Sequence, residues 1–129
     1  MLKKAVLLNT RGTKQMLDLA KEIKNLELFA HISTAYCHLE EKVKKIQLFI
    51  IKLYIIIINF QQVLGEKPYP PPADPHKIIK LVEWMEDDVV EAMTDKILGD
   101  IPNTYAFTKA LSEGLVEEAM SEVPAMILR

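Results

Sequence analysis

The sequence predicts an α/β protein: a helix-rich, incomplete doubly wound parallel sheet. Two apolar segments read as strands, Leu26–Ile32 and the terminal Val123–Arg129, and helical periodicity fills most of the chain between them. With 129 residues, 50% hydrophobic content and a net charge of −2, the chain forms one modest globular domain. Because positive and negative charges nearly balance, the sequence has no basic stripe that would bind the phosphates of a nucleic acid. The lone Cys37 excludes an internal disulfide and favours a reducing intracellular compartment.

A helix is expected first, over about residues 3–24. Its apolar positions are Ala5, Leu8, Met16, Leu19, Ala20 and Ile23. Gly12 weakens its middle by about 1 kcal/mol relative to alanine. The opening residues are amphipathic rather than uniformly apolar, so they do not predict a signal peptide. The strand at 26–32 follows, mostly apolar and therefore expected to be buried.

An Ile-rich segment at about 44–63 interrupts this pattern. Its apolar part of about 15 residues, broken by Lys52, is short of the roughly 20 that a spanning helix needs, so a membrane span is not favoured. Its residues are those of AT-rich codons, which leads to the hypothesis that it is translated intron. Transcripts that skip it would support that hypothesis.

The segment Pro68–Pro75 must be extended, because proline fixes φ and biases its predecessor away from helix. A connector beside the site is favoured over the alternative of a polyproline ligand for a partner's groove. Helices are then expected from Pro75 to Trp84, from about Glu86 to a stop at Gly99, and from Asn103 or Thr104 onward. The apolar positions of the last helix are Phe107, Ala110, Leu111, Leu115 and Met120.

Tyr105 and Lys109 stand four residues apart on this last helix, so they project from one face. A phenol is a poor proton donor at neutral pH because its pKa is high. A neighbouring ammonium and a nicotinamide cofactor supply positive potential, which lowers the pKa of the phenol toward the working pH. The ammonium can also hold ribose hydroxyls of the cofactor. This spacing also arises by chance on solvated helix faces, so it needs support from its context.

That context is a pair of hydroxyls, Ser33 and Thr34, directly after the strand at 26–32. Ligands of open α/β sheets bind beyond the carboxyl ends of the strands. Either hydroxyl could donate to a substrate carbonyl oxygen, where charge develops in the transition state. Cys37, His38 and His31 fall short of a closed four-ligand set, so a zinc site is disfavoured.

Five segments together resemble the fatty acyl-CoA reductases, particularly the insect members. They are Leu8–Thr13, His31–His38, Glu66–Ile79, Val82–Met85 and Ile97–Lys109. The family belongs to the extended short-chain dehydrogenase/reductases, so the resemblance implies a partial Rossmann-type, NAD(P)-binding domain over residues 1–129, with 44–63 as a non-family insertion. It implies NADPH as cofactor, and reduction of a long-chain fatty acyl-CoA to a fatty alcohol with release of CoA.

The resemblance also implies residue roles and a location. Tyr105 and Lys109 match the active-site pair that also binds the cofactor. Thr34 or Ser33 matches the hydroxyl that binds the substrate carbonyl, and Thr34 is preferred because it directly precedes Ala35. Asn9 is a weaker match to a helix residue that supports a proton relay. The implied location is the surface of the peroxisome or endoplasmic reticulum. The alternative is a non-catalytic, membrane-associated or partner-binding chain that uses the Ile-rich segment or the Pro-rich loop.

No Gly-rich turn for a dinucleotide pyrophosphate is present, because no two of Gly12, Gly65, Gly99 and Gly114 are close enough in sequence to form one. The expectation is therefore an internal slice of a larger reductase that carries the catalytic residues without the N-terminal dinucleotide-binding strand, turn and helix.

Overall fold

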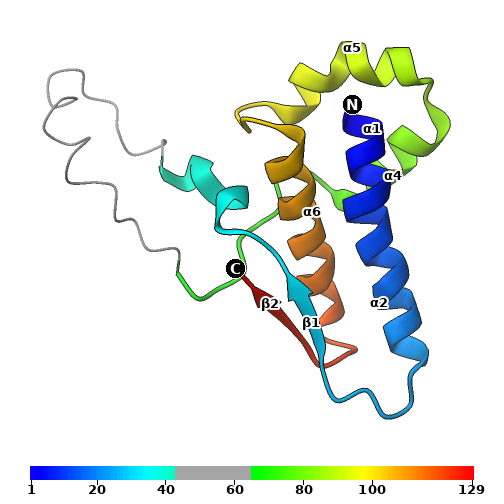
Figure 1. Cartoon of the computed structure of the whole chain (residues 1–129), viewed down its shortest axis with the longest axis vertical. Helices are drawn as coiled ribbons and strands as arrows, with labels where there is room; N and C mark the ends of the chain where they lie inside the picture. The colour runs from blue at the N-terminus through cyan, green and yellow to red at the C-terminus, as the bar shows by residue number, and fades with distance from the viewer. Residues whose placement is uncertain (43–64) are drawn as a thin grey trace, which may run out of the picture.

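The computed structural model describes residues 1–42 and 65–129, and it shows an α/β arrangement of a small parallel sheet and packed helices (Figure 1). The predicted insertion at 44–63 lies outside the described residues. The elements are α1 (Leu2–Ala5), η1 (Val6–Arg11), α2 (Gly12–Glu22), β1 (Phe29–Ile32), η2 (Ala35–Lys42), α4 (Pro75–Trp84), α5 (Asp87–Leu98), α6 (Thr104–Ala119) and β2 (Ala125–Leu128). This order confirms the helix-rich α/β class.

The first three elements form one continuous helix, because the residues at their junctions keep right-handed helical dihedrals. Residues Val6–Arg11 have the wider π-helical turn. The helix predicted over 3–24 is therefore confirmed, and it runs from Leu2 to Glu22. Isolated π turns inside α-helices are frequent at functional sites.

Most of the apolar positions expected for this helix do not face the core, although Ala20 is buried. Four of its expected apolar positions are half or more exposed: Leu8, Met16, Leu19 and Ile23. The buried residues are Leu2, Val6, Thr10, Leu17 and Ala20. Two stripes of this helix have helical spacing, and periodicity alone cannot tell which of them meets α6 and α4.

Strands β1 and β2 pair in parallel, from Phe29 opposite Ala125 to Ile32 opposite Leu128. The chain crosses between them through α6, which packs against β2. Figure 1 shows the first helix beside α6 and the two strands at the lower end of α6. The strand predicted over 26–32 is shorter, and the expectation that it is buried is wrong, since Ile32 is 67% exposed. Pairing begins where the carbonyl of Pro124 accepts from the amide of Phe29, so the residues before Phe29 have no ladder to join.

The three later helices begin close to where the sequence predicts, and α4 and α5 also end close to the predicted residues. The Asp74 side chain accepts hydrogen bonds from the amides of His76 and Lys77, and the Asn103 side chain accepts from the amide of Ala106, so both helices have capped N-termini. Helix α5 ends at Gly99, whose φ of 58° favours glycine. The expected inward position of Met120 is wrong, because this residue follows the helix and is 37% exposed.

The hydrophobic core lies where the first helix, α4, α5 and α6 meet. Its fully buried members include Leu2, Val6, Val82, Val90, Phe107, Leu111 and Val116. Helix α6 is the central element, because nearly every residue from Ala106 to Val116 is buried. No helix within residues 1–42 and 65–129 is long and apolar enough to cross a membrane.

Gly114 allows the Pro-rich segment to pack on α6. A Cβ at this position would lie 2.9 Å from Cγ and 3.0 Å from Cβ of Pro71. We expect Gly114→Ala to lower the free energy of unfolding by about 1–3 kcal/mol, because the proline ring has little freedom to move aside. Gly12→Ala is the matched control: its Cβ meets nothing closer than 3.9 Å, so helix propensity should raise stability by about 0.5–1 kcal/mol. Urea unfolding of both variants checks the prediction, and equal shifts would contradict it.

Candidate functional site

Tyr105 and Lys109 occupy the first two turns of α6, at the spacing that places both on one face. The phenol of Tyr105 is in reach of solvent, since the residue is 52% exposed. Lys109 is partly buried, and its Nζ donates a 2.6 Å hydrogen bond to the carbonyl of Ile32, the last residue of β1. Burial lowers the pKa of Lys109 from its ordinary value. The Tyr/Lys face of α6 is therefore joined to the carboxyl end of β1.

Ser33 and Thr34 follow β1 directly, as the sequence predicts. The amide of Ser33 donates to the carbonyl of Leu128, which extends the ladder to the end of β2. Its Oγ lies 3.8 Å from Sγ of Cys37, whereas Oγ1 of Thr34 accepts a 3.3 Å bond from the amide of Tyr36. The two hydroxyls thus have different surroundings, and Lys109 binds the residue just before them. Which one acts on a substrate stays a prediction.

Asn9 lies in the π-helical turn and contacts α6. Its Nδ2 donates to Oγ1 of Thr108 at 3.0 Å, and its carbonyl accepts from the hydroxyls of Thr13 and Ser112. Thr108 precedes Lys109, so Asn9 is near the predicted pair through the backbone of α6. The role of Asn9 in a proton relay stays a prediction, and the observed bonds fix the first helix against α6.

His31 is a neutral, buried side chain of β1. Burial lowers its pKa to about 4, and the positive charge of Lys109 contributes in the same direction. Its Nε2 is buried without a hydrogen-bond partner in the part of the chain that the structure describes. Glu113 acts in the opposite direction: its negative charge favours the protonated imidazole and so raises the pKa of His31.

This environment makes stability depend on pH. The unfolded chain binds a proton at His31 near pH 6.5, whereas the folded chain does so only near pH 4. We therefore expect the free energy of unfolding to fall by about 1–3 kcal/mol from this residue as pH drops from 7.5 to 4.5. Urea unfolding at both pH values checks this, with His31→Leu as the non-titrating comparison. An equal loss in both proteins would contradict the prediction.

A buried carboxylate, Glu113, lies one turn beyond Lys109 and was not among the predicted site residues. It is 1% exposed, and its Oε2 is 2.7 Å from Nε2 of His38. Arg129 binds both oxygens, with Nε 3.1 Å from Oε1 and Nη2 2.7 Å from Oε2. Burial alone would raise the pKa of Glu113, but these hydrogen bonds hold it well below its ordinary value. The sequence signal for it was an acidic residue between Leu111 and Leu115, two positions expected to face the core.

Cys37, His38 and Glu113 also form a group of possible metal ligands, with donor atoms within 4.8 Å of one another. His31, which the sequence grouped with Cys37 and His38, does not belong to it. The guanidinium of Arg129 already occupies both carboxylate oxygens and supplies the positive charge that a cation would bring. This arrangement is that of a buried ion pair.

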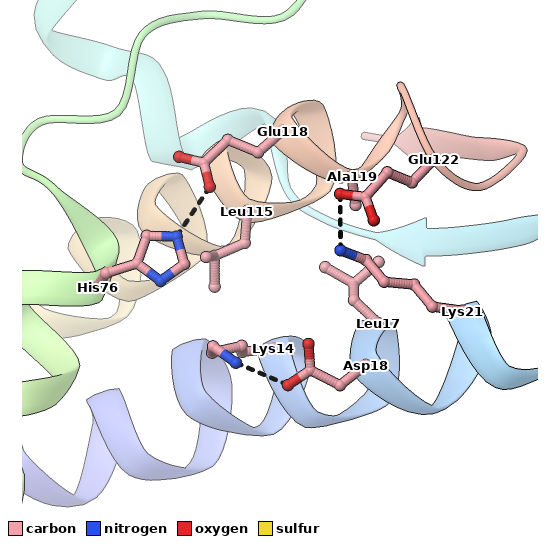
Figure 2. A pocket seen from close by; sticks show the side chains of 9 residues that line it. All are labelled: Lys14, Leu17, Asp18, Lys21, His76, Leu115, Glu118, Ala119 and Glu122. Carbon is pink, nitrogen blue, oxygen red and sulfur yellow. Dashed lines mark hydrogen bonds and ion pairs between the residues drawn. The ribbon is translucent and has the colours of Figure 1, made fainter.

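Pockets on the described surface include one beside α6 and one along β2. The first, of about 300 Å³, is between α2 and the end of α6, and Figure 2 shows its charged side chains in pairs. The pairs are Lys14–Asp18, Lys21–Glu122 and His76–Glu118. This pocket is about 15 Å along α6 from Tyr105, at 1.5 Å per residue. The second, of about 650 Å³, follows β2 and reaches Ala35, the neighbour of Thr34.

Comparison with known proteins gives a consistent result. The NAD-binding family described as male sterility protein matches residues 1–129. Fatty acyl-CoA reductase 1 of Gallus gallus and of Homo sapiens are each 39% identical over 128 residues, which is 99% of this chain and 21% of the relative. Fatty acyl-CoA reductase 2 of Mus musculus is 36% identical over 130 residues, with the same coverage. The chain thus spans about a fifth of the length of these relatives. No solved structure matches it.

Proposed function

Since this chain belongs to the fatty acyl-CoA reductase family, as the match of its whole length to the male sterility protein family shows, we propose that it carries the proton-donating part of a reductase site. The proposed reaction is the NADPH-dependent reduction of a long-chain fatty acyl-CoA to a fatty alcohol, with release of CoA. The NAD-binding family implies a nicotinamide dinucleotide, and NADPH in particular belongs to the proposal.

The observation that carries the proposal is the bond between Lys109 and the carbonyl of Ile32. It holds the Tyr105/Lys109 face of α6 at the carboxyl end of β1, the edge of a parallel sheet where ligands bind. The residues next along the chain are Ser33 and Thr34, so the phenol, the ammonium and the two hydroxyls come from segments joined by one hydrogen bond.

The residues suit the nicotinamide and ribose part of such a cofactor. The phenol of Tyr105 is accessible, and Lys109 has further N–H donors beyond the one that Ile32 accepts. Tyr105 and Lys109 would hold the ribose, and the bound dinucleotide supplies the hydride. For the pyrophosphate, the chain has no Gly-rich turn, so a further segment would have to bind it.

The chain's own residues would then handle the proton. Tyr105 donates it to the carbonyl oxygen of the substrate as negative charge develops there, and Lys109 stabilises the resulting phenolate. The hydroxyl of Thr34, or of Ser33, donates a second hydrogen bond to the same oxygen. Both reductions, of the thioester and of the aldehyde it yields, need this proton donor.

A chimera tests the proposal. This chain replaces the matching segment of the Gallus gallus reductase, and fatty alcohol formed from palmitoyl-CoA and NADPH is measured by gas chromatography. We expect alcohol formation above that of a Tyr105→Phe, Lys109→Ala chimera. A chimera that binds NADPH and has a cooperative thermal transition, but forms no more alcohol than the double variant, would overturn the proposal.

A further inference from the structure

We propose that Glu113 is a positioning residue of this site: its buried carboxylate holds the turn that carries Ser33 and Thr34 against the helix that carries Tyr105 and Lys109. This inference rests on the proposed reductase function for its catalytic meaning. Its structural content, the coupling of Glu113 to that turn, can be tested without catalysis.

Tyr105, Lys109 and Glu113 follow one another at intervals of four residues, so they project from one face of α6 over three turns. Lys109 binds the carbonyl of Ile32 on one side of the hydroxyl pair. Glu113 binds Cys37 and His38 on the other side, with Oε1 3.3 Å from Sγ and Oε2 2.7 Å from Nε2. Two successive turns of α6 therefore anchor both ends of the short segment that contains Ser33 and Thr34.

The link from Glu113 to Thr34 passes through Cys37. Sγ of Cys37 lies 2.9 Å from the carbonyl oxygen of Thr34, and the amide of Cys37 donates to the same oxygen at 3.4 Å. Ser33 joins the group through its Oγ, 3.8 Å from that sulfur. Two contacts therefore connect the carboxylate to the backbone of the hydroxyl pair.

Arg129 keeps Glu113 charged and fixes its orientation. The guanidinium binds both carboxylate oxygens, and its Nη1 donates to the carbonyl of Lys67 at 3.1 Å. The guanidinium leaves part of the acceptor capacity of the carboxylate unused. The contacts to Cys37 and His38 use the remaining acceptor capacity of the carboxylate on the turn beside the site.

The catalytic test uses the chimera with Glu113→Gln, which keeps the size and removes the charge. We expect kcat to fall by about 10–100-fold, with the KM for palmitoyl-CoA and the Kd for NADPH within about threefold. Glu117→Gln is the matched control, because Glu117 is an exposed residue one turn further along the same helix, and its kcat should stay within about twofold.

A double variant distinguishes positioning from a structural role. If Glu113 acts by placing the hydroxyl, then Glu113→Gln should cost less than about twofold once Thr34→Ala, or Ser33→Ala if that change costs more, has removed the hydroxyl. A purely structural effect would multiply the two losses. Multiplied losses, or an unchanged kcat in Glu113→Gln, would overturn the catalytic part of the proposal.

The 129-residue chain tests the coupling independently of any activity. Burial raises the pKa of the Cys37 thiol to about 11, and the charge of Glu113 adds to that shift. In Glu113→Gln, alkylation of Cys37 by iodoacetamide at pH 8 should be at least about threefold faster, and amide exchange at residues 33–38 should accelerate. Glu117→Gln should change neither. Unchanged exchange at 33–38 would overturn the coupling itself, whereas an inactive chimera with faster exchange would contradict only the proposed function.

Discussion

Tyr105→Phe should lower the rate of thioester and aldehyde reduction in the chimera by about 10²–10⁴-fold, the range for loss of a general acid. This corresponds to roughly 3–5 kcal/mol in the barrier. The substitution removes only the phenolic hydroxyl, and the residue is 52% exposed, so folding should be unaffected. Single-turnover oxidation of NADPH, followed by its absorbance, measures the change without a contribution from product release.

Tyr36→Phe is the matched control for this prediction. Tyr36 is also exposed, at 67%, and the same single oxygen is removed. Its variant should retain turnover within about twofold. If Tyr105→Phe also retained nearly full turnover, the Tyr/Lys pair would be an ordinary solvated helix face, and the mechanism proposed for this chain would be wrong.

Glu113→Ala should lower the free energy of unfolding of the 129-residue chain by about 3–5 kcal/mol, because it leaves the guanidinium of Arg129 in a largely buried place without its counter-charge. Only 14% of the Arg129 side chain and 1% of the Glu113 side chain are exposed. Glu118→Ala is the control. Glu118 pairs with His76 at 2.8 Å, but both side chains are about half exposed, so its loss should cost no more than about 1 kcal/mol.

Acid should weaken the same interaction. The folded pKa of Glu113 is held below its ordinary value of 4.5, so the stability it contributes is present above pH 4.5 and is lost as pH falls below that value. Chemical unfolding at pH 7 measures the substitution, and a series below pH 5 measures the acid effect. Equal destabilisation by Glu113→Ala and Glu118→Ala would show that the buried ion pair contributes no more to the free energy of unfolding than the exposed one.

The secondary structure was predictable wherever local chemistry decides it. Pro75 at the first helical position and the Asp74 cap set the start of α4, Gly99 at a positive φ sets the end of α5, and the Asn103 cap sets the start of α6, each within a residue or two. These signals act over three or four residues and need no tertiary partner. The spacing of Tyr105 and Lys109 was predictable for the same reason.

Burial was less predictable, because it depends on which face meets a neighbour. The first helix has two apolar stripes, and the one with Met16 and Leu19 is exposed while the one with Val6 and Leu17 is buried. Strand β1 begins only at Phe29, where the backbone of Pro124 becomes available for pairing. Both outcomes depend on segments about 100 residues away along the chain.

The sequence by itself determined the helices, the parallel strand pair, the family resemblance and the candidates Tyr105, Lys109, Ser33, Thr34 and Asn9. Only the tertiary structure decided that Lys109 binds Ile32 and that Glu113 gathers Cys37, His38 and Arg129 around one buried charge. The physical reason is one of range. Caps and periodicity follow from bonds within a single helix, whereas a buried carboxylate is stable only when donors from distant segments converge on it.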